Sequence, residues 1–185
     1  MLLTKPKQNL LLTLAWQSIA NGIKNGKPLK IDVTRYPADF AELRATFVIL
    51  EYKHSPRGSF GSLRPIRSLA EDVCENAFAA AFCDRHFPSV TDMELEELQI
   101  QIDLLSPLQN MAFSSEVELI GQLRPNIDGL VLEDEARHAC LMPAHWKTFN
   151  NPMLFLQQLK KKAGLPVTYW SKNVKVSRFT IENIS

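Results

Sequence analysis

The chain has 185 residues, of which 45% are hydrophobic and 22% are charged, and its formal net charge is +1. This composition excludes a largely disordered chain, and the length suits a single domain over residues 1–185 that buries roughly 70% of the surface of its unfolded form. With 21 basic and 20 acidic residues, no overall field exists that would attract nucleic acid or a membrane surface.

In the first half of the chain, apolar spacing and turn residues predict two helices and two strands. A leucine-rich run near the N-terminus faintly resembles a signal peptide, but its helical spacing favours a first helix from about Pro6 to Asn25. The β-branched run Ala45–Tyr52 predicts a buried strand, and Arg57–Leu63 predicts a second strand that completes a hairpin. Ser68 then starts a helix through a capping box with Glu71.

The second half adds strands with short turns between them. Thr91 caps a short helical turn, and strict alternation over Leu98–Leu105 predicts a half-buried strand. A hairpin spans residues 130–142, a helix follows Asn151, and a last strand covers residues 173–181. These elements predict an α+β fold with a mixed, largely antiparallel sheet and helices packed against it.

The segment Arg57–Gly61 (RGSFG) resembles the R-G-C-I-G signature of the AMMECR family, whose prokaryotic members are called protein A of the AmmeMemoRadiSam system. Further matching segments follow in the family's order over about residues 10 to 180: residues 76–82 with Asp84, Phe87 and Pro88, then 128–130, Pro143, Trp146, 155–156, 162–166 and Trp170. The resemblance implies a compact α+β fold with a larger and a smaller lobe. It also implies a function not firmly established for the family, beside Memo-like and radical SAM proteins as partners.

Two departures from the family pattern bear on chemistry. Ser59 stands where the signature has cysteine, and Phe60 replaces the usual isoleucine. The family's D-P-R-F segment reads Asp84-Arg85-His86-Phe87, so His86 replaces an arginine. If the family's activity depends on a thiolate, this chain has lost it, because a serine hydroxyl needs a nearby general base to act as a nucleophile.

A small anionic ligand is the first expectation for a site. Glycines allow close approach of the backbone, arginine can grip a carboxylate or phosphate with two hydrogen bonds, and the segment leads into a positive helix end. The alternative is a glycine-containing strand bulge with arginines in water. The predicted ligand-binding residues are Arg57, Gly58, Phe60, Gly61, Arg64 and Arg67.

Catalysis is the second expectation. Ser59 would be the nucleophile, with His54, His86 or Asp84 as general base, acting on a small anionic substrate. The sequence thus leaves two main alternatives, an accessory protein that binds a ligand or partner and an enzyme. A purely structural interaction protein is a third, and its sign would be unusually large exposed apolar patches.

Metals and cofactors receive little support from the sequence. Cys83 with His86, and His138 with Cys140, could make a tetrahedral zinc site, but nothing brings the pairs together, and we expect no metal. The chain contains no phosphate-binding loop and no dinucleotide fingerprint, so we expect no cofactor. Trp146 and Trp170 are expected to be packing residues, and three cysteines without a C-x-x-C pair predict a reducing, cytoplasmic location.

Overall fold

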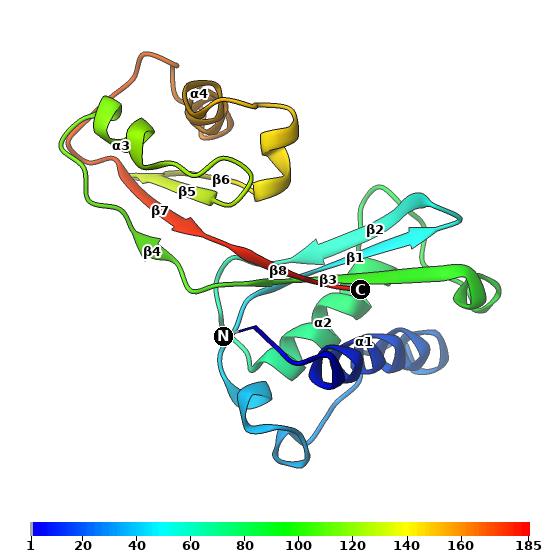
Figure 1. Ribbon diagram of the computed structural model, residues 1–185. Coiled ribbons are helices and arrows are strands. Elements are labelled where there is room, and N and C mark those ends of the chain that lie inside the picture. The colour runs from blue at the N-terminus through cyan, green and yellow to red at the C-terminus, as the bar shows by residue number, and fades with distance from the viewer. Residues whose placement is uncertain (1) are drawn as a thin grey trace. The chain divides into compact units, whose positions relative to one another are not determined.

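The computed structural model describes residues 2–185, which form two compact units, each with its own sheet and its own core (Figure 1). Among the described residues, unit 1 comprises residues 2–105 and Glu182–Ser185, and unit 2 comprises Ser106–Ile181. The predicted α+β class is confirmed, although the strands are divided between two four-stranded sheets.

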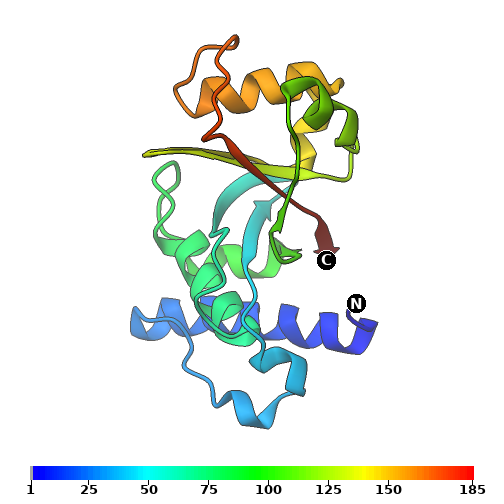
Figure 2. The same ribbon diagram turned by 90° about the vertical axis from the view of Figure 1, so that its left-hand side faces the viewer.

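Unit 1 is a sheet with two helices on one of its faces. The strand order is β2-β1-β3-β8, and β1 pairs antiparallel with both β2 and β3. Helices α1 and α2 pack against each other on the same side of this sheet (Figures 1 and 2). The bounds are α1 Lys5–Asn25, β1 Thr46–Tyr52, β2 Ser55–Gly61, α2 Leu69–Phe82, β3 Leu98–Leu105 and β8 Ile181–Ile184.

The alternation that predicted β3 is confirmed by its burial. Leu98, Ile100, Ile102 and Leu104 all belong to the core of unit 1, because every second side chain of a strand points to the same face. The capping box at the start of α2 is also present: Ser68 accepts from the amide of Glu71, and the Glu71 carboxylate accepts from the amide of Ser68.

Unit 2 contains the predicted hairpin and the predicted helix after Asn151. Its strand order is β4-β7-β5-β6, all pairs antiparallel. The bounds are β4 Gln109–Asn110, α3 Glu116–Gln122, β5 Gly129–Asp134, β6 Arg137–Leu141, α4 Pro152–Lys162 and β7 Lys175–Phe179. Short 3₁₀ helices occupy Val33–Arg35, Ala38–Ala41, Asp92–Glu97 and Pro143–Lys147.

Three features differ from the predictions. The single strand expected over residues 173–181 is two strands, β7 and β8, which belong to different sheets. Helix α3 and strand β4 were not predicted. Lys160, in the last turn of α4, is buried and pairs with Glu116 at 2.7 Å, a contact that no local sequence pattern predicted. No helix within residues 2–185 is long and apolar enough to cross a membrane.

Candidate functional site

The Arg57 side chain makes its hydrogen bonds to other residues of unit 1. Its Nε donates to Oε1 of Glu94 at 2.6 Å and its Nη2 donates to Oε2 at 3.1 Å. Nη1 donates to the carbonyl of Pro88 at 2.8 Å, and Nη2 also reaches the carbonyl of Ser89 at 3.3 Å. The residue is only 8% exposed. Through these hydrogen bonds, two of them to the Glu94 carboxylate, the guanidinium holds the segment after α2 against β2.

The two signature glycines also serve internal packing. A Cβ at Gly58 would lie 2.2 Å from the carbonyl oxygen of Ala80, so α2 can approach β2 only because this position has no side chain. A Cβ at Gly61 would lie 2.5 Å from the ring of Phe47. The close approach that the sequence suggested for a ligand is made here by a helix backbone and an aromatic ring.

The two residues between the glycines are exposed and lie on opposite faces of the sheet. Because Gly58 faces α2, strand alternation places Phe60 on the helix side and Ser59 on the other face. Phe60 is 43% exposed. The Ser59 hydroxyl is exposed and makes no hydrogen bond within residues 2–185.

Asp84 contacts the other two predicted catalytic residues, Ser59 through its backbone and His86 through its backbone and its ring. Its Oδ2 accepts from the backbone N–H of Ser59 at 2.8 Å, and its Oδ1 accepts from the backbone N–H of His86 at 2.8 Å. Nδ1 of His86 lies 3.1 Å from the same Oδ1, while the imidazole is 85% exposed. The N–H groups of His86 and Ser59 lower the pKa of Asp84, so its carboxylate is a fixed anion.

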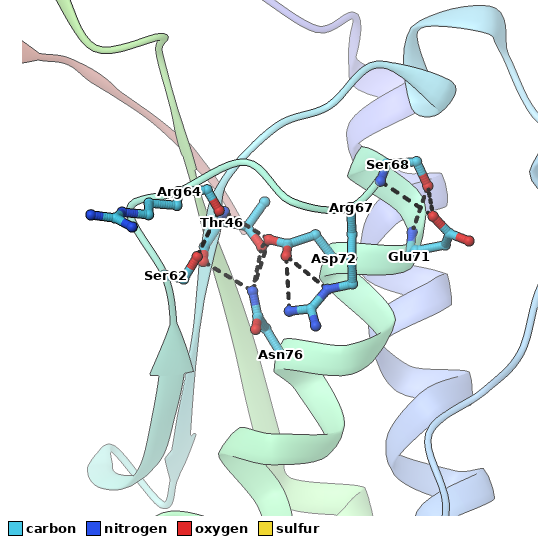
Figure 3. Close-up of polar contacts among 8 residues, drawn as sticks. All are labelled: Thr46, Ser62, Arg64, Arg67, Ser68, Glu71, Asp72 and Asn76. Carbon is cyan, nitrogen blue, oxygen red and sulfur yellow. Dashed lines mark hydrogen bonds and ion pairs between the residues drawn. The ribbon is translucent and has the colours of Figure 1, made fainter.

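Arg67 belongs to a polar network beneath the N-terminus of α2 (Figure 3). Nε and Nη2 of Arg67 lie 3.2 and 3.1 Å from Oδ1 of Asp72, a residue with no exposed surface. Oδ2 of Asp72 accepts from the backbone N–H and hydroxyl of Thr46 and from the amide of Asn76. Burial raises the pKa of Asp72, and its bonds with Thr46 and Arg67 oppose that shift.

Arg67 also lines a hollow of about 290 Å³ within unit 1. Arg67 is one-third exposed, and its Nη1 makes no hydrogen bond within residues 2–185. Lys30 and Glu75 contribute charges that have no ion-pair partner in the described part of the chain. The lining residues are Leu29, Lys30, Ile31, Arg67, Glu71 and Glu75. The hollow therefore combines two apolar side chains with four charged ones, which carry charges of both signs.

Arg64 is separate from this network. Its side chain is exposed and points away from Asp72 and Arg67 (Figure 3). Its carbonyl accepts from the hydroxyl of Ser62 at 2.9 Å, which shapes the turn after β2. Of the six predicted ligand-binding residues, Arg67 alone lines this hollow.

The cysteine–histidine pairs considered for zinc lie in different units, Cys83 with His86 in unit 1 and His138 with Cys140 in unit 2. Within residues 2–185, no group of three or more histidine, cysteine or acidic side chains is arranged to hold a metal ion. Burial raises the pKa of Cys74 to about 12 and that of Cys140 to about 11, so both thiols stay protonated and unreactive.

Sequence reasoning missed Lys30, Asp72 and Glu75 as members of a site. Asp72 and Glu75 lie one and four residues after Glu71, on the helix whose capping box was recognised, so a helix projection could have placed them beside Arg67. Lys30 lies in a polar segment without a repeating pattern, and no local signal places it there.

Proteins of known sequence or structure that are similar to this chain match it over most of its length. A protein of Methanothermobacter thermautotrophicus is 28% identical over 96% of this chain and 93% of its own length. A protein of Thermotoga maritima is 31% identical over 89% of this chain and 90% of its own. The crystal structure of the uncharacterised protein PH0010 from Pyrococcus horikoshii superposes with a TM-score of 0.85 at 26% identity, over 98% of this chain and 92% of that one.

The family assignment does not depend on any single motif. The model of the AMMECR1 family matches residues 12–184, which include β2 with its signature segment, the Asp84 loop and both sheets. The chain therefore belongs to the AMMECR1 family.

Proposed function

We propose that this protein is a ligand-binding accessory protein that holds a small carboxylate in the hollow at Arg67. The observation that carries the proposal is the placement of a half-paired guanidinium and the unpaired Lys30 ammonium in one hollow. Asp72 orients the guanidinium through Nε and Nη2, which leaves Nη1 to donate to a ligand oxygen. A cation fixed in advance loses less conformational entropy when it binds an anion.

The acidic side chains of the hollow restrict the ligand. Glu71 and Glu75 would repel a second negative charge, so phosphate dianion is disfavoured relative to a monocarboxylate. A ligand that also carries an ammonium group should bind more tightly, because the carboxylates of Glu71 and Glu75 attract its positive charge. The expected order of affinity is glycine at least equal to acetate, and acetate above phosphate.

The contacts of the signature segment support placing the ligand in the hollow at Arg67 and not at Arg57. Its arginine and its two glycines are already in contact with other residues of unit 1. Arg57 donates to Glu94, Pro88 and Ser89, and the spaces beside Gly58 and Gly61 are filled by Ala80 and Phe47. We propose that Arg57 is a positioning residue, and that Phe60 and Arg64 act as exposed contacts for a partner. Direct contact of Arg57 with a ligand stays a prediction from the sequence.

The test compares two lysine variants of the same loop. Lys30→Gln removes one cation of the hollow, whereas Lys27→Gln removes an exposed cation that does not line it. Acetate and glycine are titrated against each protein, with the melting temperature and isothermal calorimetry as readouts. Lys30→Gln should weaken binding about three- to fivefold, equivalent to roughly 0.6 to 1 kcal/mol, because Lys30 is exposed, and Lys27→Gln should leave it unchanged. Equal affinities in both variants, or no binding by the parent protein, would contradict the proposal.

Catalysis is the second candidate, and one contact favours it. Asp84 holds Nδ1 of the exposed His86, which leaves Nε2 free, as in acid–histidine pairs that prepare a general base. Ser59 is tied to the same carboxylate through its backbone N–H. A fluorophosphonate probe should label Ser59 if the cluster is catalytic. Labelling that is lost in Ser59→Ala and slowed in His86→Gln would favour the enzyme over the accessory protein.

The partners that we propose rest on family membership. Memo-like and radical SAM proteins are the expected partners of an AmmeMemoRadiSam-like system, and the exposed Phe60 at the end of β2 is the contact that we assign to them. Size-exclusion chromatography of purified mixtures tests this assignment. A complex that survives in Phe60→Ala as well as in the parent would contradict the role given to Phe60.

A further inference from the structure

A second hollow lies wholly within unit 2 and has a different character. Its volume is about 460 Å³, and it is lined by Phe113, Ser114, Trp170, Ser171, Lys172 and Val174. The rings of Phe113 and Trp170 lie 5.6 Å apart at 54°, which makes an angled aromatic wall. Ligand sites in this size range are typically lined by aromatic side chains with a few polar groups.

Trp170 differs from the other tryptophan of unit 2, although the sequence predicted packing for both. Trp146 is buried, stacks on Phe155 at 3.9 Å, and donates its indole N–H to the carbonyl of Asp128. Trp170 is half-buried, and its indole N–H makes no hydrogen bond within residues 2–185. A packing role thus accounts for Trp146 but leaves a donor of Trp170 unused.

The Trp170 ring is fixed from within the unit by Lys160. The Lys160 ammonium lies 5.4 Å from the ring centroid and is 1% exposed. It is held by Glu116 at 2.7 Å and by the carbonyl of Val167 at 3.0 Å. A buried cation against an indole face stabilises the ring's position. Lys160 therefore supports one face of the Trp170 ring from within unit 2.

Some polar groups of this hollow already have hydrogen-bond partners within unit 2, and others do not. The Ser114 hydroxyl donates to Glu118, and the Ser171 hydroxyl donates to Asp134 at 3.4 Å and accepts from the backbone N–H of Asn173. Lys172 is exposed and has no ion pair among the described residues. Among the described residues, the unpaired donors of the hollow are thus the Trp170 indole N–H and the Lys172 ammonium, and the second is cationic.

We propose that this hollow binds a small aromatic carboxylate, whose ring packs on Phe113 and Trp170 and whose carboxylate accepts from the indole N–H or the Lys172 ammonium. An aromatic ring gains offset or edge contacts with the wall, and Val174 adds apolar surface. This site is independent of the hollow at Arg67, because it lies in the other unit and selects for a ring.

Indole N–H resonances provide a direct test, because the chain has three tryptophans. Trp170→Phe assigns the Trp170 signal in a ¹H–¹⁵N spectrum. Benzoate should shift that signal in the parent protein and leave Trp146 unmoved, whereas benzyl alcohol, which lacks the charge, and acetate, which lacks the ring, should shift it much less. Lys172→Gln should weaken benzoate binding about three- to fivefold, as expected for an exposed charge pair.

A matched control separates the site from general charge effects. Lys175→Gln removes an exposed lysine of β7 that does not line the hollow, and it should bind benzoate as the parent does. The proposal is overturned if benzoate leaves the Trp170 signal in place at millimolar concentration. It is also overturned if acetate moves the signal as far as benzoate does, or if the Lys172 and Lys175 variants lose affinity equally.

Discussion

The signature segment of β2 and the hollow at the start of α2 each contain one arginine and are close in sequence, but they differ in what their polar groups contact. In the signature segment, Arg57 has internal acceptors and the glycines lie against other parts of unit 1. In the hollow, Lys30 and Glu75 have no ion-pair partner within residues 2–185. The glycines and the arginine of the signature segment therefore serve packing within unit 1, while the charges without ion-pair partners lie in the neighbouring hollow.

The two arginines also meet their carboxylates in different surroundings. The Arg57 hydrogen bonds lower the pKa of Glu94 to about 2, because they stabilise the charged form. Burial raises the pKa of Asp72 in spite of Arg67, because desolvation outweighs the hydrogen bonds. The ionised Glu94 thus stabilises the fold. The ionised form of Asp72 is instead disfavoured by its burial, and this carboxylate keeps Arg67 in position.

The largest expected effect is that of Asp72→Ala. It removes the acceptor of Thr46, Asn76 and Arg67 in a site without exposed surface. Leaving buried donors unpaired should lower the free energy of unfolding by on the order of 4 kcal/mol. Urea unfolding followed by circular dichroism measures this loss. A loss below about 1 kcal/mol would mean that the network does not hold Arg67.

Gly58→Ala should be next in size. The added Cβ would meet the carbonyl oxygen of Ala80 at 2.2 Å, so α2 must move away from β2. We expect a loss on the order of 3 kcal/mol, as for overpacking of a tight contact. Gly121→Ala is the control, because nothing lies within 4 Å of its Cβ and alanine favours the helix. Equal stability of both variants would remove the packing explanation of the signature.

Glu94→Gln tests the ion pair between Arg57 and Glu94 through the pH dependence of the free energy of unfolding. The folded pKa of Glu94 is about 2 and its ordinary value is 4.5, so its stabilisation is complete above pH 4.5 and is lost as the pH falls toward 2. At neutral pH the variant should be less stable by on the order of 2 kcal/mol, and the difference should vanish in acid. Glu96→Gln changes an exposed carboxylate of the same turn and serves as the control. A difference that persists at pH 2 would contradict a stabilising ion pair.

The smallest effect is expected for Ser59→Cys, which restores the residue of the family signature. Ser59 is exposed, and only its backbone N–H is used, by Asp84. The free energy of unfolding should change by less than about 0.5 kcal/mol. A large change would show that the hydroxyl has a structural partner.

Local signals predicted much of the fold but not the partners of the site residues. The Ser68–Glu71 capping box and the alternation over β3 depend on neighbours in sequence, and both were correct. The acceptors of Arg57 lie 31 to 37 residues away, on a segment whose approach depends on α2 and Gly58. The division of the last strand into β7 and β8 follows from two sheets that no periodicity reveals.

Backbone amide shift mapping with acetate and glycine tests the difference between the two regions most directly. Binding in the hollow predicts that the largest perturbations fall on residues 29–31, 67, 71 and 75, while those of residues 57–61 stay close to zero. Perturbations centred on residues 57–61, with none at Lys30 or Arg67, would show that the signature segment itself contacts the ligand and would contradict this account.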